Sequence, residues 1–140
     1  MRTTVYLSRP LVARVATNGP TVRPVWFLWE DEAFWWLTGP WAHLNDLLED
    51  DPRAVLVVDT CDLATGEVLQ VTARGRIEIR PYDRARAIRK LRRYLGPDIS
   101  AWDATFDPDA MAEAKFGRLA PTKLSARDLS FKPSADGRSG

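Results

Sequence analysis

The stretch from Ala13 to Pro40 constrains the fold of this chain more than any other. Two turn signals, Asn18-Gly19-Pro20 and Glu30-Asp31-Glu32, divide it into three short runs of β-branched, aromatic and aliphatic residues. We expect these runs to form a three-stranded antiparallel meander. Apolar residues occupy both alternating sets of positions in the middle run, so both of its faces must be covered. Such a meander is typical of the wall of a small barrel, and barrels often hold a ligand at their mouth or seam.

The middle run, residues 21–29, is predicted to be one continuous strand. Strict alternation would place Val25, Phe27 and Trp29 on one face, and Trp26 and Leu28 on the other. The chain has 6 tryptophans, and all but Trp102 lie between positions 26 and 41. This concentration indicates either a dense aromatic core or a platform for a planar ligand.

The bulk properties exclude several classes of protein. A chain of 140 residues fits one domain, and its net charge of +1 gives no overall electrostatic attraction to nucleic acid or an anionic membrane. Cys61 is the single cysteine, so no internal disulfide can form. The first ten residues lack the apolar core of a signal peptide, and no run is long enough to span a membrane. We therefore expect a cytoplasmic protein without nucleic-acid or membrane partners.

The remainder of the chain predicts further strands and two helices. Residues 67–80 alternate between apolar and polar, with Gly75 marking a bend. A helix over 84–95 would be capped by Asp83 and ended by Gly96-Pro97. The other expected elements are a short helix over 41–50, a central strand over 53–61 and closing strands over 115–121 and 123–131. The predicted fold is mostly β (α+β): an antiparallel barrel of six to seven strands with two peripheral helices, formed by residues 11–131 between a lead-in (1–10) and a mobile tail (132–140).

The helix over 84–95 is rich in arginine. Its basic side chains could bind an anion or nucleic acid, but we prefer the interpretation that acidic neighbours balance a solvated face.

Common catalytic signatures are absent from the sequence. It contains no glycine-rich phosphate loop, no G-x-S-x-G elbow and no cysteine pair for a metal, and His43 is its only histidine. No catalytic residue or metal site can be assigned, and the sequence does not favour a self-contained hydrolase. A barrel of this kind can borrow chemistry from a redox cofactor, with Val25 to Phe27 and Thr38-Gly39 forming a flat slot. Arg74 and Arg76 are then candidate phosphate or substrate contacts.

The order of segments resembles a known family. ARVATNGPTVRPVWFLWEDEAFWWLTG is followed by DPRAVLVVDT, QVTARGRIEI, KLRRYLG and KLSARDLSF. This order over about residues 10–131 is similar to that of the pyridoxamine 5'-phosphate oxidase-like family of split β-barrels, which includes flavin- and deazaflavin-dependent reductases. The resemblance implies a homodimer that binds FMN or the deazaflavin coenzyme F-420 at the subunit interface and catalyses hydride transfer. A non-catalytic binding protein for a flavin, a tetrapyrrole or another planar ligand is the alternative.

The resemblance also implies cofactor-binding positions. The segment that lies along the flavin ring in the family matches Arg23, Val25, Trp26 and Phe27. The strand end on the phosphate side matches Thr38 and Gly39. The strand that closes the pocket matches Gln70 and Thr72. Relatives place basic residues, which hold the cofactor's phosphate, where this chain has Leu44 and Asp46, with Trp41 and His43 nearby. The phosphate would therefore need Arg23, Arg74, Arg76 or His43 of either subunit, or the ligand is a different one.

Overall fold

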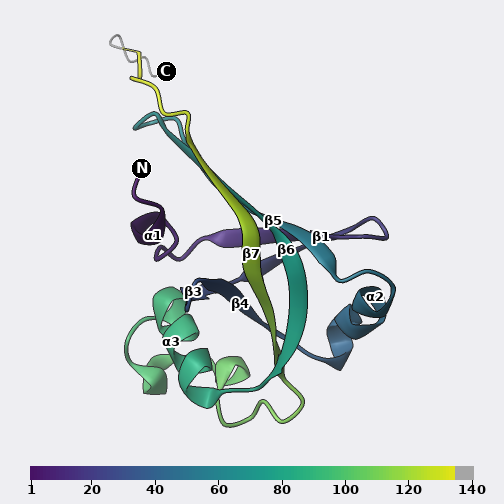
Figure 1. Ribbon diagram of the computed structural model, residues 1–140. Coiled ribbons are helices and arrows are strands. Elements are labelled where there is room, and N and C mark those ends of the chain that lie inside the picture. Colours follow the sequence, from purple (N-terminus) through teal and green to yellow (C-terminus); the bar gives the residue numbers. More distant parts are fainter. Residues whose placement is uncertain (135–140) are drawn as a thin grey trace.

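The computed structural model describes residues 1–134 and consists of one curled antiparallel sheet with helices at its ends (Figure 1). The sheet has 7 strands in the order β2-β1-β5-β6-β7-β4-β3. This confirms the prediction of a mostly β split barrel. The predicted tail lies largely outside the described residues. The elements are α1 (Thr3–Tyr6), β1 (Val12–Thr17), β2 (Thr21–Trp26), β3 (Leu28–Glu30), β4 (Ala33–Thr38), η1 (Pro40–Ala42), α2 (Leu44–Asp50), β5 (Arg53–Asp62), β6 (Glu67–Pro81), α3 (Arg84–Leu95), η2 (Ile99–Ala101), η3 (Ala104–Phe106) and β7 (Lys115–Asp128).

The middle run is not one continuous strand, so that prediction was wrong. It breaks at Phe27 into β2, which pairs with β1, and β3, which pairs with β4. Phe27 and Leu28 are both fully buried, at 0% and 1% exposure, so the predicted alternation of faces also fails at this point. The physical reason is that one short run serves two ends of the same sheet, and the backbone must change direction between them.

The C-terminal region also differs from the prediction. Residues 115–121 and 123–131 were expected to form two strands, but they form the single strand β7, which ends at Asp128. Its register against β6 shifts between Arg74↔Lys123 and Gly75↔Pro121, which leaves Thr122 as an extra, bulged residue. The bend that Gly75 suggested is therefore present, but the additional residue lies on the partner strand.

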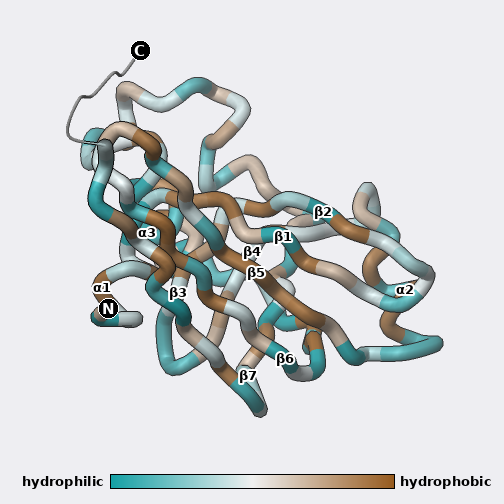
Figure 2. Tube along the Cα trace, turned by 90° about the horizontal axis from the view of Figure 1, so that it is seen from above, coloured by the Kyte–Doolittle hydropathy of each residue, from teal (hydrophilic) through white to brown (hydrophobic). Residues whose placement is uncertain are grey.

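The inner face of the curled sheet encloses the hydrophobic core. Figure 2 shows hydrophobic segments along the strands and hydrophilic residues at the turns. Alternate positions on β1, β5 and β6 are buried, as their sequence periodicity predicts. The largest fully buried side chains include Trp36, Phe27, Phe34 and Leu56. The core therefore uses part of the tryptophan cluster and leaves the rest at the surface or at the seam between β2 and β3.

The Tyr94 hydroxyl, on α3, joins the two ends of the sheet where β2 passes into β3. The Phe27 N–H donates to Tyr94 Oη at 3.0 Å, and the hydroxyl donates to the Leu11 carbonyl at 2.7 Å, with the Phe27 carbonyl at 3.2 Å. The Tyr94 ring stacks on Trp26 at 4.5 Å between centroids. Phe106 stacks on Trp26 as well, at 5.6 Å. The seam is therefore closed by hydrogen bonds to backbone atoms and by an aromatic stack.

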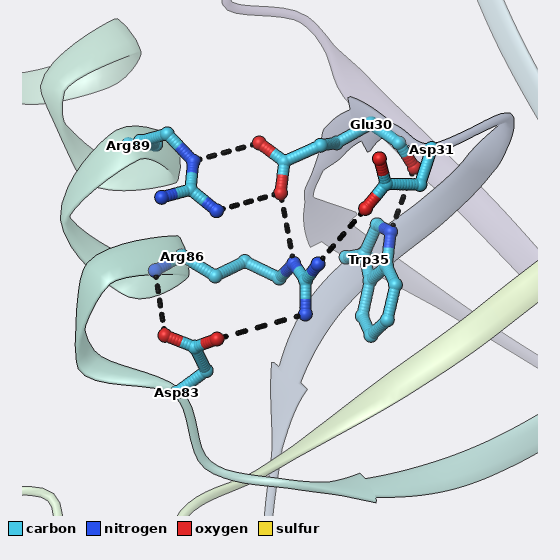
Figure 3. A network of polar contacts seen from close by, with 6 residues as sticks. All are labelled: Glu30, Asp31, Trp35, Asp83, Arg86 and Arg89. Atoms are coloured by element: carbon cyan, nitrogen blue, oxygen red, sulfur yellow. Dashed lines mark hydrogen bonds and ion pairs between the residues drawn. The ribbon is translucent and has the colours of Figure 1, made fainter.

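An ionic network attaches α3 to the β3–β4 hairpin (Figure 3). Arg89 donates two hydrogen bonds to Glu30, and Arg86 contacts Glu30 at 3.0 Å and Asp31 at 3.2 Å. The Arg86 guanidinium also lies over the Trp35 ring, 3.6 Å from its centroid. Arg89 and Arg86 lower the pKa of Glu30 by hydrogen bonding, against desolvation. The expectation that acidic neighbours balance this helix is confirmed for these arginines.

Lys90 is buried beneath the seam at 4% exposure, with its Nζ 6.0 Å from the centroid of the Trp26 ring. No carboxylate in residues 1–134 lies within ion-pair distance of it. Desolvation lowers the pKa of Lys90 to about 8. The charged form is therefore disfavoured in the folded state, and burial of this amine reduces stability at neutral pH.

No helix in residues 1–134 is long and apolar enough to cross a membrane.

The Tyr94→Phe variant should be destabilised by about 1–3 kcal/mol, because it leaves a buried Phe27 N–H and Leu11 carbonyl without their partner. Urea denaturation followed by circular dichroism measures the change. The matched control is Tyr82→Phe, which removes one hydrogen bond to the Pro108 carbonyl in a loop. If Tyr82→Phe lost as much free energy of unfolding as Tyr94→Phe, or more, the proposed role of the Tyr94 hydroxyl in closing the seam would be contradicted.

The Lys90→Met variant should be more stable than the wild type at pH 7, by up to about 3 kcal/mol. Between pH 8 and 10.5, the folded wild type binds fewer protons than its unfolded chain, so its stability rises with pH in this window. The advantage of the variant should therefore shrink as pH rises through that window. Thermal unfolding at pH 7 and pH 10 tests this, with the exposed Lys132→Met as control. A pH-independent difference would be evidence against it.

Candidate functional site

A pocket of about 310 Å³ opens where the edge strand β2 approaches β4, and we call it the split pocket. Two tryptophans, Trp36 and Trp41, line it, and Trp36 is only 1% exposed. Four of the residues predicted from the sequence, Arg23, Val25, Thr38 and Trp41, also line it. The full lining is Thr21, Val22, Arg23, Pro24, Val25, Trp36, Leu37, Thr38, Trp41 and Ala42. The structure therefore brings together the ring-side and phosphate-side positions that are far apart in sequence.

Three buried polar atoms on this lining have no hydrogen-bond partner: Arg23 Nε, Trp36 Nε1 and Thr38 Oγ1. Buried polar groups in proteins are nearly always hydrogen-bonded, so each of these atoms carries a desolvation cost. Arg23 is held in place by a 2.8 Å hydrogen bond from its Nη1 to the Ala42 carbonyl. The three atoms are two N–H donors, one of them on a cation, and one hydroxyl. They can hydrogen-bond the polar edge of a ligand whose rings lie against the tryptophans.

Trp41 depends on the glycine two residues before it. The backbone of Gly39 is extended, and a Cβ added there would lie 2.1 Å from the Trp41 ring. Only glycine therefore allows the ring to lie over this strand end. Trp41 is 63% exposed, which is unusual for so large an apolar side chain. The ring is thus an exposed platform beside the split pocket.

Two further hollows adjoin the split pocket around Trp41. One, of about 150 Å³, shares Thr38 and is lined by Gly39, Glu113 and Lys115 among others. The second, of about 440 Å³, shares Leu37 and Trp41 and is mainly apolar. Its remaining lining residues are Thr105, Ala110, Met111, Ala112, Glu113 and Ala114. The three hollows together place tryptophans, a charged pair of residues (Glu113 and Lys115) and an apolar lining next to one another.

The phosphate-side positions carry no cation of their own. Leu44 is buried in the core at 1% exposure. Asp46 is exposed and lies 3.9 Å from His43 Nδ1. His43 has left-handed backbone geometry with φ of 51° and lines none of the hollows around Trp41. Among the residues that line the adjoining hollow, Lys115 is the basic one, and Glu113 accompanies it.

The remaining candidate residues do not line the split pocket within one chain. Trp26 stacks on Tyr94 and on Phe106, and Phe27 is fully buried. Gln70 and Thr72 lie on β6 opposite Asp59 and Val57 of β5, on a different part of the sheet. Their assignment to a cofactor site stays a prediction.

Trp36 was not predicted from the sequence as a site residue. It lies two residues before Thr38 on β4, so both side chains project from the same face of that strand. This two-residue spacing was the signal in the sequence that could have identified Trp36. The signal was weak because Trp36 belongs to an apolar run, which predicts a core position, and the structure does bury it, at 1% exposure.

Comparisons with known proteins bear on the family and on the fold of this chain. The family model described as pyridoxamine 5'-phosphate oxidase matches residues 4–128. No curated protein matches the chain. A conserved hypothetical protein from Mycobacterium tuberculosis has a similar structure, with a TM-score of 0.74 at 16% identity over 100% of this chain and 94% of that one.

Two other similar structures have descriptions that name a cofactor. The structure of an FAD-binding protein from Mesorhizobium loti gives a TM-score of 0.61 at 21% identity, covering 91% of this chain and 92% of that one. An F420 reductase gives 0.59 at 23% identity, covering 85% of this chain and 92% of that one. At these identities the likeness shows the shared fold.

Proposed function

The chain belongs to the pyridoxamine 5'-phosphate oxidase family, and on that premise we propose that it is a flavin- or deazaflavin-dependent oxidoreductase. The observation that carries the proposal is the lining of the split pocket. It includes two tryptophans, and three of its residues have a buried polar atom without a hydrogen-bond partner. Similar folds in proteins described as FAD-binding and as an F420 reductase support it. The reaction would transfer a hydride between the bound cofactor and a small organic substrate.

The residues of the split pocket fit the ring system of such a cofactor. A flavin or deazaflavin supplies reversible hydride transfer, and the protein supplies position and electrostatics. Arg23 Nε and Trp36 Nε1 can donate to the polar edge of the ring, and the positive charge of Arg23 favours electron density arriving there. Trp41 lines the same pocket and would contact the bound ring system. Thr38 Oγ1 offers a further hydrogen bond near the strand end.

The apolar hollow across Trp41 is the proposed substrate side. Leu37 and Met111 line it, and Glu113 is its only charged residue. A small conjugated or aromatic molecule without negative charge suits this lining, because an anion would have to be buried beside the Glu113 carboxylate.

A homodimer is part of the proposal. Gln70 and Thr72, which match cofactor-contacting positions of the family, do not line the split pocket of their own chain, so a second copy would supply them. The β5–β6 turn and the C-terminal end of β7 project away from α2 and α3 (Figure 1). Exposed apolar side chains follow this extension: Leu63 at 71%, Leu124 at 40%, Leu129 at 49% and Phe131 at 48%. Such a surface is typical of a protein interface. A cytoplasmic location also belongs to the proposal, since Cys61 can form no internal disulfide.

The second candidate function is non-catalytic binding of a flavin, a tetrapyrrole or another planar ligand. Leu44 and Asp46 favour it, because the phosphate-side cations of the family are missing there. Charge-assisted hydrogen bonds contribute roughly 1.5–3 kcal/mol each, so their loss disfavours a phosphorylated cofactor. Tight binding of a cofactor with no turnover over a panel of substrates would favour this function, whereas steady reductase activity would exclude it.

Purified protein should bind FMN, FAD or coenzyme F-420, seen as quenching of the cofactor's fluorescence and a shifted absorbance spectrum. Arg23→Gln should weaken binding about tenfold or more, because a charge-assisted hydrogen bond is lost. Trp41→Ala should weaken it as well. Arg80→Gln, which changes an exposed arginine that pairs with Glu78, is the matched control. If the protein bound none of the three cofactors, the proposal of a flavin- or deazaflavin-dependent oxidoreductase would be refuted.

Sedimentation equilibrium should give a dimer, and Leu129→Glu should shift it toward monomer by placing a charge on the exposed apolar surface. Arg92→Gln, on α3, changes an exposed residue that lines none of the hollows described above; it is the control and should leave the association unchanged. A monomeric wild type would refute the dimer.

A further inference from the structure

The outer face of β6 carries a row of polar side chains. The alternate positions of this strand are buried in the core, so the residues between them project together from the opposite, outer face. We call them the β6 row: Gln70, Thr72, Arg74 and Arg76. A strand advances about 3.3 Å per residue, so the row is roughly 20 Å long. One elongated molecule can therefore contact both the uncharged and the charged members of the row.

Apolar side chains adjoin the β6 row on β5. Val57 lies directly opposite Thr72, and Val55 lies directly opposite Arg74, so both valines share the outer face. Both are only partly buried in the single chain. β5 and β6 also lead into the turn that carries Leu63, one of the exposed residues of the proposed dimer surface. The face is therefore continuous with that surface, and its mixture of apolar and polar groups fits contact with a second copy of the chain.

The two arginines of the β6 row have no counter-ion in their own chain. Arg76 lies directly opposite Arg53, and Arg74 lies directly opposite Lys123. Asp51 accepts hydrogen bonds from Arg53 Nε at 2.9 Å and Nη2 at 2.7 Å. Over residues 1–134, no carboxylate lies within ion-pair distance of Arg74 or Arg76. Like charges directly opposite each other destabilise a sheet, so an anion from outside the chain would relieve this cost.

The split pocket has the opposite deficiency. At its phosphate-side positions Leu44 is buried in the core and Asp46 is an anion, so these positions offer no cation to a phosphate group. Arg74 and Arg76 line neither the split pocket nor the two hollows around Trp41. Within one chain, the unpaired cations and the pocket that lacks them are therefore kept apart, and a second copy can bring them together.

We propose that Arg74 and Arg76 of one subunit bind the phosphate group of the cofactor held in the split pocket of the other subunit. This inference rests on the proposed function and names what the second copy contributes to that site. Gln70 and Thr72, which match cofactor-contacting positions, belong to the same row, so the docking that delivers them also delivers the arginines. In a two-fold dimer both subunits use the same surface, so each pocket receives one row. Guanidinium groups bind phosphate through paired, charge-assisted hydrogen bonds.

FMN and riboflavin share one ring system, and only FMN has a phosphate group, so comparing them isolates the phosphate contact. In isothermal titration, the wild type should bind FMN at least tenfold more tightly than riboflavin. The double variant Arg74→Gln, Arg76→Gln should lose this preference and still bind riboflavin as the wild type does. Arg80→Gln, an exposed arginine farther along β6, is the matched control and should keep the preference. Lys115→Gln should keep it too, although Lys115 lines the hollow beside Thr38.

A mixed dimer tests whether the contact crosses between subunits. One subunit carries Arg74→Gln and Arg76→Gln, the other carries Arg23→Gln, and two different affinity tags isolate the mixed dimer. If the arginines act across the interface, one pocket keeps its own Arg23 and receives an intact β6 row, while the other pocket collects all the substitutions. The mixed dimer should then bind one FMN with wild-type affinity, whereas both variant homodimers bind weakly. If the arginines served their own subunit, neither pocket of the mixed dimer would be intact.

The proposal is overturned by an unchanged preference for FMN in the double variant, by loss of that preference in Lys115→Gln or Arg80→Gln, or by a mixed dimer without a wild-type site. A merely structural role of the arginines would weaken riboflavin binding as well and lower the unfolding temperature of the cofactor-free double variant, which also counts against it. Removal of like-charge repulsion should instead keep or raise that temperature. These outcomes leave the proposed function standing, whereas no binding of FMN, FAD or coenzyme F-420 refutes both.

Discussion

The rest of the structure depends on the closure of the sheet at Phe27. The edge strands β2 and β3 lie at opposite ends of the strand order, yet one residue separates them in the chain. A sheet with that connectivity cannot lie flat and must curl until its ends meet. The Tyr94 hydroxyl then satisfies the backbone atoms that neither strand pairs. The enclosed core, the position of α3 and the opening between β2 and β4 all follow from this junction.

The same closure explains how the tryptophans are divided. Trp36 points into the enclosed core, Trp26 is fixed in the aromatic stack at the seam, and Trp41 remains on the surface beside the split pocket. The two alternatives for the cluster, a dense core or a ligand platform, are therefore both partly realised. The split pocket combines them, since a core tryptophan and an exposed one share its wall.

Unpaired buried polar groups gather at the split pocket and are costly to the folded chain. Arg23, Trp36 and Thr38 each leave one polar atom there without a partner. On the neighbouring helix α3, by contrast, Arg86 and Arg89 are both paired with Glu30. The contrast supports interpreting the split pocket as a binding site, because a ligand can restore the hydrogen bonds that the fold leaves unmade.

The sequence by itself determined the element types, the mostly β class, the helix over 84–95 with its Asp83 cap and the bend at Gly75, because these follow from local periodicity and turn chemistry. The family resemblance located Arg23, Val25, Thr38 and Trp41, which share one pocket. Only the tertiary structure decided that residues 21–29 break at Phe27, that Trp36 joins the site and that Arg74 and Arg76 do not line the split pocket of their own chain. Those outcomes depend on which strands become neighbours when the sheet curls, and alternation along one strand carries no information about its partners.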